Sequence, residues 1–147
     1  MRAAAGVRMD EVVHAHGHEH VSAEHESTLE VTSDDFLTPA GDCILGIEAD
    51  RVPSEFDPDF VAACQDGDAT ITMTIEAGGN TDTVTGSGHP DLTFESDRSH
   101  VCRTSDYVDD RTVMVEADAA ATDLDRGLVA ALADGADATI TFAVETP

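Results

Sequence analysis

Hydrophobic and polar residues alternate, or apolar residues run together, at strand length in four stretches of each half of the chain. Alternation with a period of two is typical of β-strands, in which successive side chains point to opposite faces of a sheet. The pattern therefore predicts four strands in each half. Their expected positions are 11–17, 27–32, 43–49, 69–77, 81–88, 99–104, 111–117 and 138–146.

One segment in each half has instead the features of a short helix, and it precedes the last strand of that half. Asp57, followed by Pro58, begins the first segment, and either Asp123 or Asp125 begins the second. An aspartate at the N-cap accepts a hydrogen bond from a free main-chain amide, and proline loses nothing in the first turn. The glycines expected to end these helices in the left-handed conformation are Gly67 and Gly135.

The order strand, strand, strand, helix, strand is thus expected twice, and sequence matches between the halves indicate an internal repeat. Four short segments match and keep their order, which is typical of duplicated units. The second match aligns Thr32 with Thr104. The matched segments are 13–18 with 84–89, 32–36 with 104–107, 47–50 with 115–118, and 60–72 with 128–141.

These patterns predict a mainly β fold with two short helices (α+β), as a single domain over residues 9–147. The domain is expected to consist of two repeats, about 10–79 and 80–147, related by a pseudo-two-fold axis. Residues 1–8 precede the first alternation and are expected to form a disordered extension. The pattern does not distinguish a duplicated β-barrel from a β-sandwich-like arrangement.

The charge of the chain is strongly one-sided, with 31 acidic residues against seven basic ones, all arginine, and a net charge of -24. Such self-repulsion destabilises a compact state in dilute buffer, but at molar salt the screening length shrinks to about 3 Å. We therefore expect a halophilic, haloarchaeal source, with surface cations drawn from the salt. Disorder is the rival interpretation, and the periodic arrangement of 41% hydrophobic residues argues against it. Non-specific binding of nucleic acid is not expected, since it needs clustered cations.

Cysteine usage and hydropathy indicate the cellular compartment. The three cysteines, Cys43, Cys64 and Cys102, have no C-x-x-C spacing, so we interpret them as buried apolar residues in a reducing compartment. The start of the chain has no signal-peptide pattern, and no window of 18 uncharged apolar residues follows. The expectation is a cytoplasmic protein without a membrane segment.

Five of the seven histidines lie within twelve positions, four of them at alternate residues of the run HAHGHEH. If residues 12–21 form one strand, these four share a face, with neighbouring Cα atoms about 6.6 Å apart. Imidazoles at that spacing can converge on Zn²⁺ or another divalent transition metal at about 2.0–2.1 Å, with Glu19 or a neighbouring carboxylate as a further ligand. The alternative is a solvated face. The metal candidates are His14, His16, His18, His20 and His25.

Only His18 has a histidine counterpart in the second half, at His89. Both follow a glycine, which lets another main chain approach closely. We therefore expect these two histidines to occupy corresponding places and to share a structural role in hydrogen bonding.

A second candidate site is the arginine-containing stretch 98–111. A planar guanidinium suits bidentate binding of a phosphate or carboxylate ligand. The alternative is that these arginines pair with acidic neighbours such as Asp106, Asp109 and Asp110. The candidate residues for a small anionic ligand are Arg103, Arg111, Ser105 and Asp42.

Several short motifs are shared with a known family. They are Gly17 with His18, His25, Leu37 to Pro39, Gly41 to Ile44, Gly88 to Leu92, Arg103, Ser105 with Asp106, and Arg111 with Thr112. On these motifs the chain from Met9 to about Val144 resembles an archaeal family known as domain of unknown function 371. The resemblance implies an archaeal source and a β-rich fold, and it implies no activity and no catalytic residue.

Three functional hypotheses remain open at this point. The leading one is a small intracellular binding module for a metal ion or a small anionic ligand. The second is a metal-dependent hydrolase or lyase, with an open zinc position and Glu19, Glu24 or Asp42 as base. The third is a structural or protein-interaction domain. The sequence has no phosphate-binding loop, dinucleotide fingerprint or H-E-x-x-H helix, so it predicts no catalytic residue.

Overall fold

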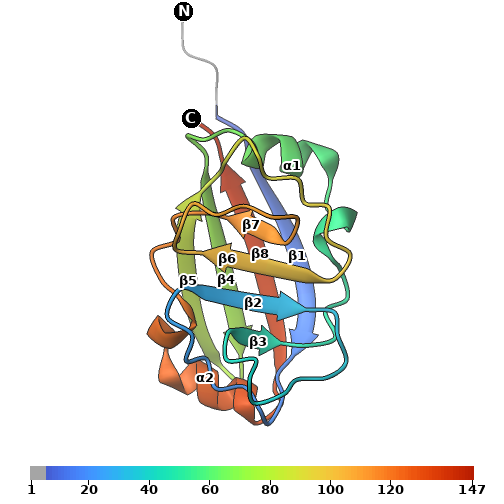
Figure 1. The fold of residues 1–147 in the computed structure, drawn as a ribbon, viewed down its shortest axis with the longest axis vertical. Helices are drawn as coiled ribbons and strands as arrows, with labels where there is room; N and C mark the ends of the chain where they lie inside the picture. Colours follow the sequence, from blue (N-terminus) through green and yellow to red (C-terminus); the bar gives the residue numbers. More distant parts are fainter. Residues whose placement is uncertain (1–5) are drawn as a thin grey trace, which may run out of the picture.

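Eight strands and four short helices make up the computed structural model, which describes residues 6–147 (Figure 1). The strands are β1 (Arg8–His16), β2 (Thr28–Thr32), β3 (Ile44–Gly46), β4 (Thr70–Ala77), β5 (Asn80–Ser87), β6 (Ser99–Arg103), β7 (Thr112–Met114) and β8 (Asp137–Glu145). The helices are the 3₁₀-helices η1 (Pro53–Glu55) and η2 (Ala121–Asp123) and the α-helices α1 (Pro58–Cys64) and α2 (Arg126–Ala133).

The strands form two four-stranded sheets that pack face to face with their strands crossing (Figure 1). The first sheet has the order β1-β8-β4-β5 and is antiparallel throughout. The second has the order β3-β2-β6-β7, with an antiparallel pair at its centre and parallel pairs at its edges. Residues 6–147 therefore form two open sheets and not a closed barrel. The predicted mainly β fold with two short α-helices is confirmed.

The core lies between the two sheets, and β1 shows how the sequence pattern produces it. Val13 and Ala15 are buried, while Val12 and His14, which alternate with them, are exposed. One end of the core, next to α1, is aromatic, and its rings lie between 5.5 and 6.0 Å apart. The cluster consists of Phe56, Phe60, Phe94, His100 and Phe142.

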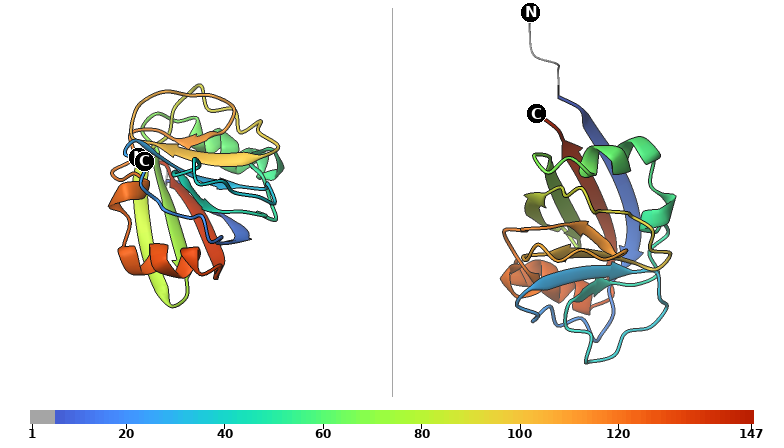
Figure 2. Two further views of the ribbon diagram at one scale, coloured as in Figure 1. Left: turned by 60° about the horizontal axis from the view of Figure 1, so that its bottom comes forward. Right: turned by 45° about the horizontal axis from the view of Figure 1, so that its top comes forward.

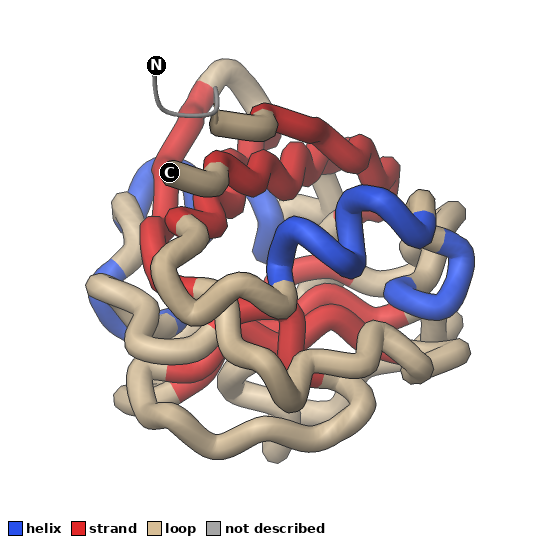
Figure 3. The backbone as a smooth tube through the Cα atoms, turned by 90° about the horizontal axis from the view of Figure 1, so that it is seen from above, coloured by secondary structure: helices blue, strands red, loops and turns tan. Residues whose placement is uncertain are grey.

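Loops cover the outer side of the second sheet, as Figure 3 shows. As a result, even polar residues of this sheet are buried, among them Thr32, Ser99 and Thr112. The helices α1 and α2 lie at opposite ends of the sandwich (Figure 2). None of the helices in residues 6–147 is long and apolar enough to cross a membrane.

The order of three strands, a 3₁₀-helix, an α-helix and a strand occurs twice along the chain. Corresponding hydrogen bonds show how the two halves align. The amide of Ala49 donates to the carbonyl of Thr32 (3.0 Å), and the amide of Ala117 donates to that of Arg103 (2.9 Å). Thr32 therefore corresponds to Arg103, and not to Thr104 as the sequence match indicated. A shift of one residue matters in a strand because it exchanges the two faces.

Both α-helices begin at an aspartate N-cap. The side chain of Asp57 accepts from the amide of Asp59, and the side chain of Asp125 accepts from the amide of Leu128. Of the two candidates for the second helix, Asp125 is thus the cap. Asp123 instead ends η2, where its carboxylate accepts from the amide of Ala120.

The two helices end differently. Gly135 has a φ of 81° and donates to the carbonyl of Leu132 (3.0 Å), so the predicted left-handed helix end is confirmed there. The same prediction for Gly67 is wrong, since its φ is not positive. Gly67 lies in a turn that is closed by a hydrogen bond from Ala69 to Asp66, after the helix has already ended.

Strand pairing begins earlier than the sequence pattern indicated. β1 starts at Arg8, and the amide of Thr146 donates to the carbonyl of Val7 (2.9 Å). Residues 1–5 of the expected extension lie outside the described residues. The three cysteines are free thiols, with Cys64 and Cys102 buried and Cys43 half-buried. Burial raises the pKa of Cys43 to about 11 and that of Cys64 to about 12, so both are neutral near pH 7.

Candidate functional site

The histidine-rich segment does not form one strand face, because β1 ends at His16. The condition for a shared histidine face, that residues 12–21 form one strand, is therefore not met. The cause is a long-range contact at Gly17, where a Cβ atom would collide with the carbonyl of Leu132 at the end of α2. The chain turns at this point, and His18 and His20 lie beyond the strand with their rings 5.1 Å apart.

Hydrogen bonds also occupy the ring nitrogens of His16. Its Nδ1 donates to the carbonyl of Gly17 (2.8 Å), and its Nε2 lies 2.9 Å from Oε1 of Glu48. Both partners are acceptors, so the ring is best satisfied when both nitrogens carry a proton. The bond to Glu48 raises the pKa of His16 accordingly. An imidazole in this state has no lone pair for a metal ion.

His18 and His89 make the same turn in the two halves. Nδ1 of His18 accepts from the amide of His20, and Nδ1 of His89 accepts from the amide of Asp91, both at 3.0 Å. Each histidine also follows a glycine that packs against the carbonyl end of the α-helix of the other half. Because Nδ1 is the acceptor, the ring proton is on Nε2, and neither nitrogen is free to bind a metal ion.

His25 has a comparable role at the start of β2. Its Nδ1 accepts from the amides of Ser27 (3.3 Å) and Thr28 (3.1 Å). Ser96 takes the corresponding place before β6, where its hydroxyl accepts from two amides at 3.1 Å. Across residues 6–147, no group of three or more histidine, cysteine or acidic side chains is placed to hold a metal ion.

Arg103 and Arg111 converge on one carboxylate, that of Asp109. Each donates from Nη2 to Oδ2 of Asp109 at 3.0 Å. Arg103 also donates to the hydroxyl of Thr112 (2.8 Å), and its guanidinium lies 4.8 Å from the ring centroid of Tyr107. Partial burial opposes ionisation of Asp109, but the bonds from both arginines hold its pKa down at about 2. Both guanidinium groups thus have a counter-ion within the chain.

Within residues 6–147, the other two ligand candidates form no hydrogen bond with this arginine pair. Ser105 is exposed, and its hydroxyl accepts from the amide of Tyr107 (3.3 Å) with no adjacent base. Asp42 is half-buried, and its main-chain carbonyl accepts from Glu24 and His25. Neither arrangement provides an activated nucleophile.

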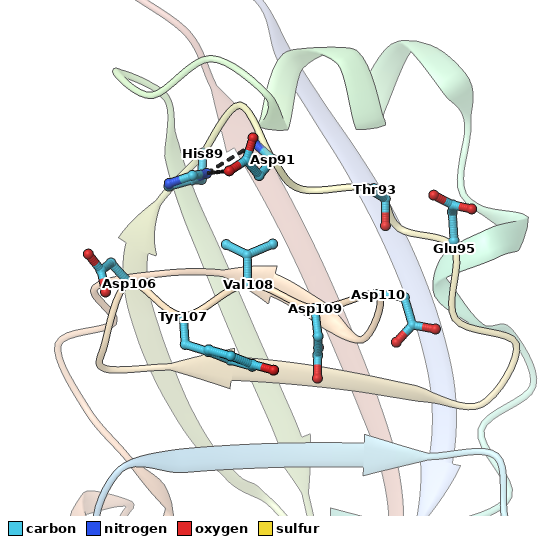
Figure 4. A pocket seen from close by; sticks show the side chains of 9 residues that line it. All are labelled: His89, Asp91, Thr93, Glu95, Asp106, Tyr107, Val108, Asp109 and Asp110. Carbon is cyan, nitrogen blue, oxygen red and sulfur yellow. Dashed lines mark hydrogen bonds and ion pairs between the residues drawn. The ribbon is translucent and has the colours of Figure 1, made fainter.

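A pocket of about 550 Å³ lies between the segment after β5 and the loop between β6 and β7 (Figure 4). We call it the acidic pocket, because five carboxylates contribute to its wall. Its lining residues are His89, Asp91, Thr93, Glu95, Asp106, Tyr107, Val108, Asp109 and Asp110.

Sequence reasoning identified His89 from this lining and missed Tyr107, Asp91 and Glu95 as site residues. A signal for Tyr107 was present, since it is the one tyrosine of the chain and lies in an acidic stretch. The structure shows that it is 59% exposed. Asp91 and Glu95 gave no signal among so many acidic residues.

Comparison with known proteins gives the family but no activity. The family model described as "Domain of unknown function (DUF371)" matches residues 13–145. A protein of Methanocaldococcus jannaschii, named only as an uncharacterized protein, is 39% identical over 127 residues, which cover 86% of this chain and 93% of the relative. That relative is archaeal, in line with the resemblance seen in the motifs. The chain therefore belongs to the archaeal family known as domain of unknown function 371.

Proposed function

We propose that this protein is a non-catalytic binding module whose acidic pocket accepts a small organic cation. The observation that carries the proposal is the charge of the pocket wall. Asp91, Glu95, Asp106 and Asp110 line the pocket, and within residues 6–147 no arginine forms an ion pair with them. Two unit charges about 4 Å apart attract by about 4 kcal/mol near a protein surface, so a cation gains from each of them.

The charge and size of the pocket favour an organic cation over an anion or a bare metal ion. An anion would face carboxylates with which no arginine of residues 6–147 forms an ion pair, while Arg103 and Arg111 are already bound to Asp109. Pockets for small organic ligands have about 300–1,000 Å³, a range that includes this one. Tyr107 also lines the pocket, and the guanidinium of Arg103 lies 4.8 Å from its ring centroid, so this ring already attracts one cation.

Intrinsic fluorescence provides a direct test, since Tyr107 is the one tyrosine and the chain has no tryptophan. We expect putrescine or spermidine to change the tyrosine emission saturably, and phosphate to leave it unchanged. The double variant Asp91→Asn with Asp110→Asn should weaken binding by about tenfold or more, whereas Asp59→Asn, on α1 outside the pocket, should not. An equal response in both variants, or none with any cation, would contradict the proposal.

A protein-interaction domain is the second candidate function. Phe36 and Tyr107 are 57% and 59% exposed, and each lies in the loop that follows the central strand of its half. Exposed aromatic residues are enriched at interfaces. Retention of a protein partner that is lost in the double variant Phe36→Ser with Tyr107→Ser would favour this function. For a metal-dependent hydrolase or lyase, the occupied ring nitrogens of His16, His18 and His25 leave little support.

We further infer a haloarchaeal, cytoplasmic protein that works at high salt. Seven arginines can neutralise at most seven of 31 acidic residues, so most carboxylates repel one another unless salt screens them. We expect the melting temperature, followed by circular dichroism, to be lower in about 0.1 M KCl than above about 2 M KCl. Equal melting temperatures in the two conditions would remove the physical basis of this inference.

A further inference from the structure

In the second half of the chain, the side chain of Arg126 fills a groove beside η2 at the start of α2. Its Nε donates to the carbonyl of Leu124 (3.0 Å). Its Nη2 donates to the carbonyls of Ala121 (2.9 Å) and Thr122 (3.2 Å), and its Nη1 donates to that of Ala23 (3.2 Å). Four main-chain carbonyl groups thus converge on one guanidinium.

The first half has the same main-chain framework. Phe56 ends η1 with φ -70° and ψ 151°, and Leu124 ends η2 with φ -70° and ψ 154°. Phe94 has a φ of 53°, and its counterpart Ala23 has a φ of 49°, both in the left-handed region that non-glycine residues rarely adopt. Carbonyl groups in matching conformations point in matching directions. The counterparts of the four acceptors are the carbonyls of Pro53, Ser54, Phe56 and Phe94.

Within residues 6–147, no guanidinium donates to these four carbonyls of the first half, because the residue after the helix N-cap is Pro58 where the second half has Arg126. Arg51 donates instead to the carbonyl of Glu55 (3.2 Å). A pocket of about 430 Å³ lies there instead, and we call it the proline pocket. Its lining includes all four residues whose carbonyls correspond to the acceptors of Arg126. They are Pro53, Ser54, Phe56 and Phe94.

We propose that the proline pocket binds an alkyl guanidinium group, such as that of agmatine or an arginine side chain, in the way that the second half holds Arg126. A guanidinium has five N–H donors in a planar fork and no acceptor, which suits a site built from carbonyl oxygens. An ammonium has three donors and no plane. The rings of Phe56 and Phe94 line the same pocket and give it an apolar wall against which the alkyl part of such a ligand can pack. The guanidinium of Arg51 already lies 5.2 Å from the ring centroid of Phe56.

The charge around the pocket favours the same class of ligand. Glu95 lies at its edge and also lines the acidic pocket, so the two pockets share one carboxylate. A net charge of -24 attracts cations toward the whole surface and excludes anions. The proposal does not depend on the acidic pocket having a ligand of its own, because its acceptors are main-chain carbonyls of other residues.

The test compares two matched ligands by calorimetry and amide chemical-shift changes, N-acetyl-arginine methylamide and N-acetyl-lysine methylamide. We expect saturable binding of the arginine compound, with the lysine compound weaker by about tenfold or more. Agmatine and an arginine-containing peptide as further ligands distinguish a free small molecule from a side chain of a protein. Equal affinity for the two matched compounds, or no binding of either, would overturn the proposal.

Variants of the pocket decide where the ligand binds. Pro58→Arg introduces the residue found at the corresponding position of the second half. It should abolish binding, because the new side chain donates to the carbonyls itself. Pro58→Ala is the matched control and should still bind. Tyr107→Phe with Asp106→Asn alters the acidic pocket alone and should leave this binding unchanged. Binding that persists in Pro58→Arg would refute the assigned site.

The reciprocal variant, Arg126→Ala, empties the groove of the second half. It should lower the melting temperature, and the arginine compound should restore part of the loss and bind at two sites per chain. If the arginine compound raised the melting temperature of Arg126→Ala but did not bind to the wild-type chain, the carbonyl groups of the first half would not be a binding site. If Arg126→Ala does not fold, the wild-type and Pro58→Arg titrations still decide the question.

Discussion

The two halves of the molecule form the same turns and strands. They differ at a few positions where polar groups have hydrogen-bond partners in one half and lack them in the other. In the second half, Arg126 donates hydrogen bonds to a group of main-chain carbonyls. In the first half, Pro58 takes the corresponding place and cannot donate to the corresponding carbonyls, and a pocket lies there. At another pair of corresponding positions, Leu29 and His100, the second half is the less satisfied one. Both side chains are 1% exposed on the core face of neighbouring strands, and only the histidine places polar atoms there.

His100 has the one buried side-chain nitrogen or oxygen atom of residues 6–147 that lacks a hydrogen-bond partner. Its Nδ1 donates to the carbonyl of Val31 (3.2 Å), but its Nε2 is buried without a hydrogen-bond partner. The ring stacks on Phe142 at 5.5 Å. Burial lowers its pKa to about 4. The comparison indicates that the main-chain geometry shared by the two halves maintains the fold. Positions where the side chains of the two halves differ are either candidate binding sites or sites that lower the stability of the folded protein.

The largest expected effect concerns the glycines that both halves require. A Cβ atom at Gly88 would collide with the carbonyl oxygens of Cys64 and Asp66, just as one at Gly17 would collide with α2. Main-chain atoms cannot move aside without disrupting the helix end. We expect Gly88→Ala to lower the free energy of unfolding by about 3 kcal/mol or more, measured by chemical denaturation.

Gly67 provides the matched control for this prediction. A Cβ atom there meets nothing within 4 Å, and its φ is not positive. Gly67→Ala should therefore be neutral or stabilise the protein by up to about 1 kcal/mol, through the lower entropy of the unfolded chain. Similar losses in both variants would mean that close packing at Gly88 is not what selects glycine.

The second prediction makes the two halves alike at the unsatisfied histidine. His100→Leu should raise the free energy of unfolding at pH 7 by about 1 kcal/mol, because removal of the buried Nε2 without a partner outweighs the loss of the hydrogen bond from Nδ1 to the carbonyl of Val31. Leu29→His is the reciprocal change and should destabilise the protein. Denaturation curves of the three proteins at pH 7 give the measurement, and a loss of stability in His100→Leu would contradict the prediction.

The same pair of variants predicts a pH dependence. The pKa of His100 is about 4 in the folded protein and about 6.5 in the unfolded chain, so the unfolded state binds the extra proton first. The stability of the wild type should therefore fall as the pH drops from 6.5 to 4, by up to about 3 kcal/mol from this group. The stability of His100→Leu should not fall by this amount over the same pH range. If the free energies of unfolding of the wild type and His100→Leu changed equally with pH, the prediction would be wrong.

Much of the fold could be predicted from local patterns. Residues 69–77 alternate cleanly, and β4 runs over Thr70–Ala77. The histidine run was misread for a physical reason. Its alternation continues past His16, but the strand stops because Gly17 lies against the end of α2, a contact between residues far apart in the sequence. Local periodicity contains no information about such a contact.

The candidate sites could be predicted only in part. Pairing of the arginines with acidic neighbours was one of two alternatives, and the structure identifies Asp109 as the shared partner. The two pockets depend on packing between separate segments, residues 89–95 with 106–110 in the acidic pocket and residues 53–65 with 93–95 in the proline pocket, which a pattern of charges does not reveal. The difference between Pro58 and Arg126 is visible in the sequence. Its meaning depends on where the carbonyl groups point.

A third prediction concerns the acid that joins the two arginines of the second half. Gly41 takes the place of Asp109 in the first half, as the matching turn bonds to Ile44 and Thr112 show. Asp109→Asn removes the charge that Arg103 requires, and Arg103 is 11% exposed. We expect a loss of about 1–3 kcal/mol in the free energy of unfolding. The loss should persist at 2 M KCl, because salt screens partly buried pairs weakly.

The smallest expected effect comes from the exposed pair that connects the two halves, Arg98 with Asp34. Its geometry is good, with Nη2 at 2.6 Å from Oδ2 and Nε also bonded to the carboxylate. However, the side chain of Arg98 is 64% exposed, and water and salt screen such pairs strongly. We expect Asp34→Asn to lower the melting temperature slightly in dilute salt and not measurably in 2 M KCl. Asp109→Asn, measured beside it, should keep its effect in both conditions. If the two variants lost stability equally at high salt, exposure would not be what separates the two ion pairs, and good geometry alone would have to explain the contribution of both.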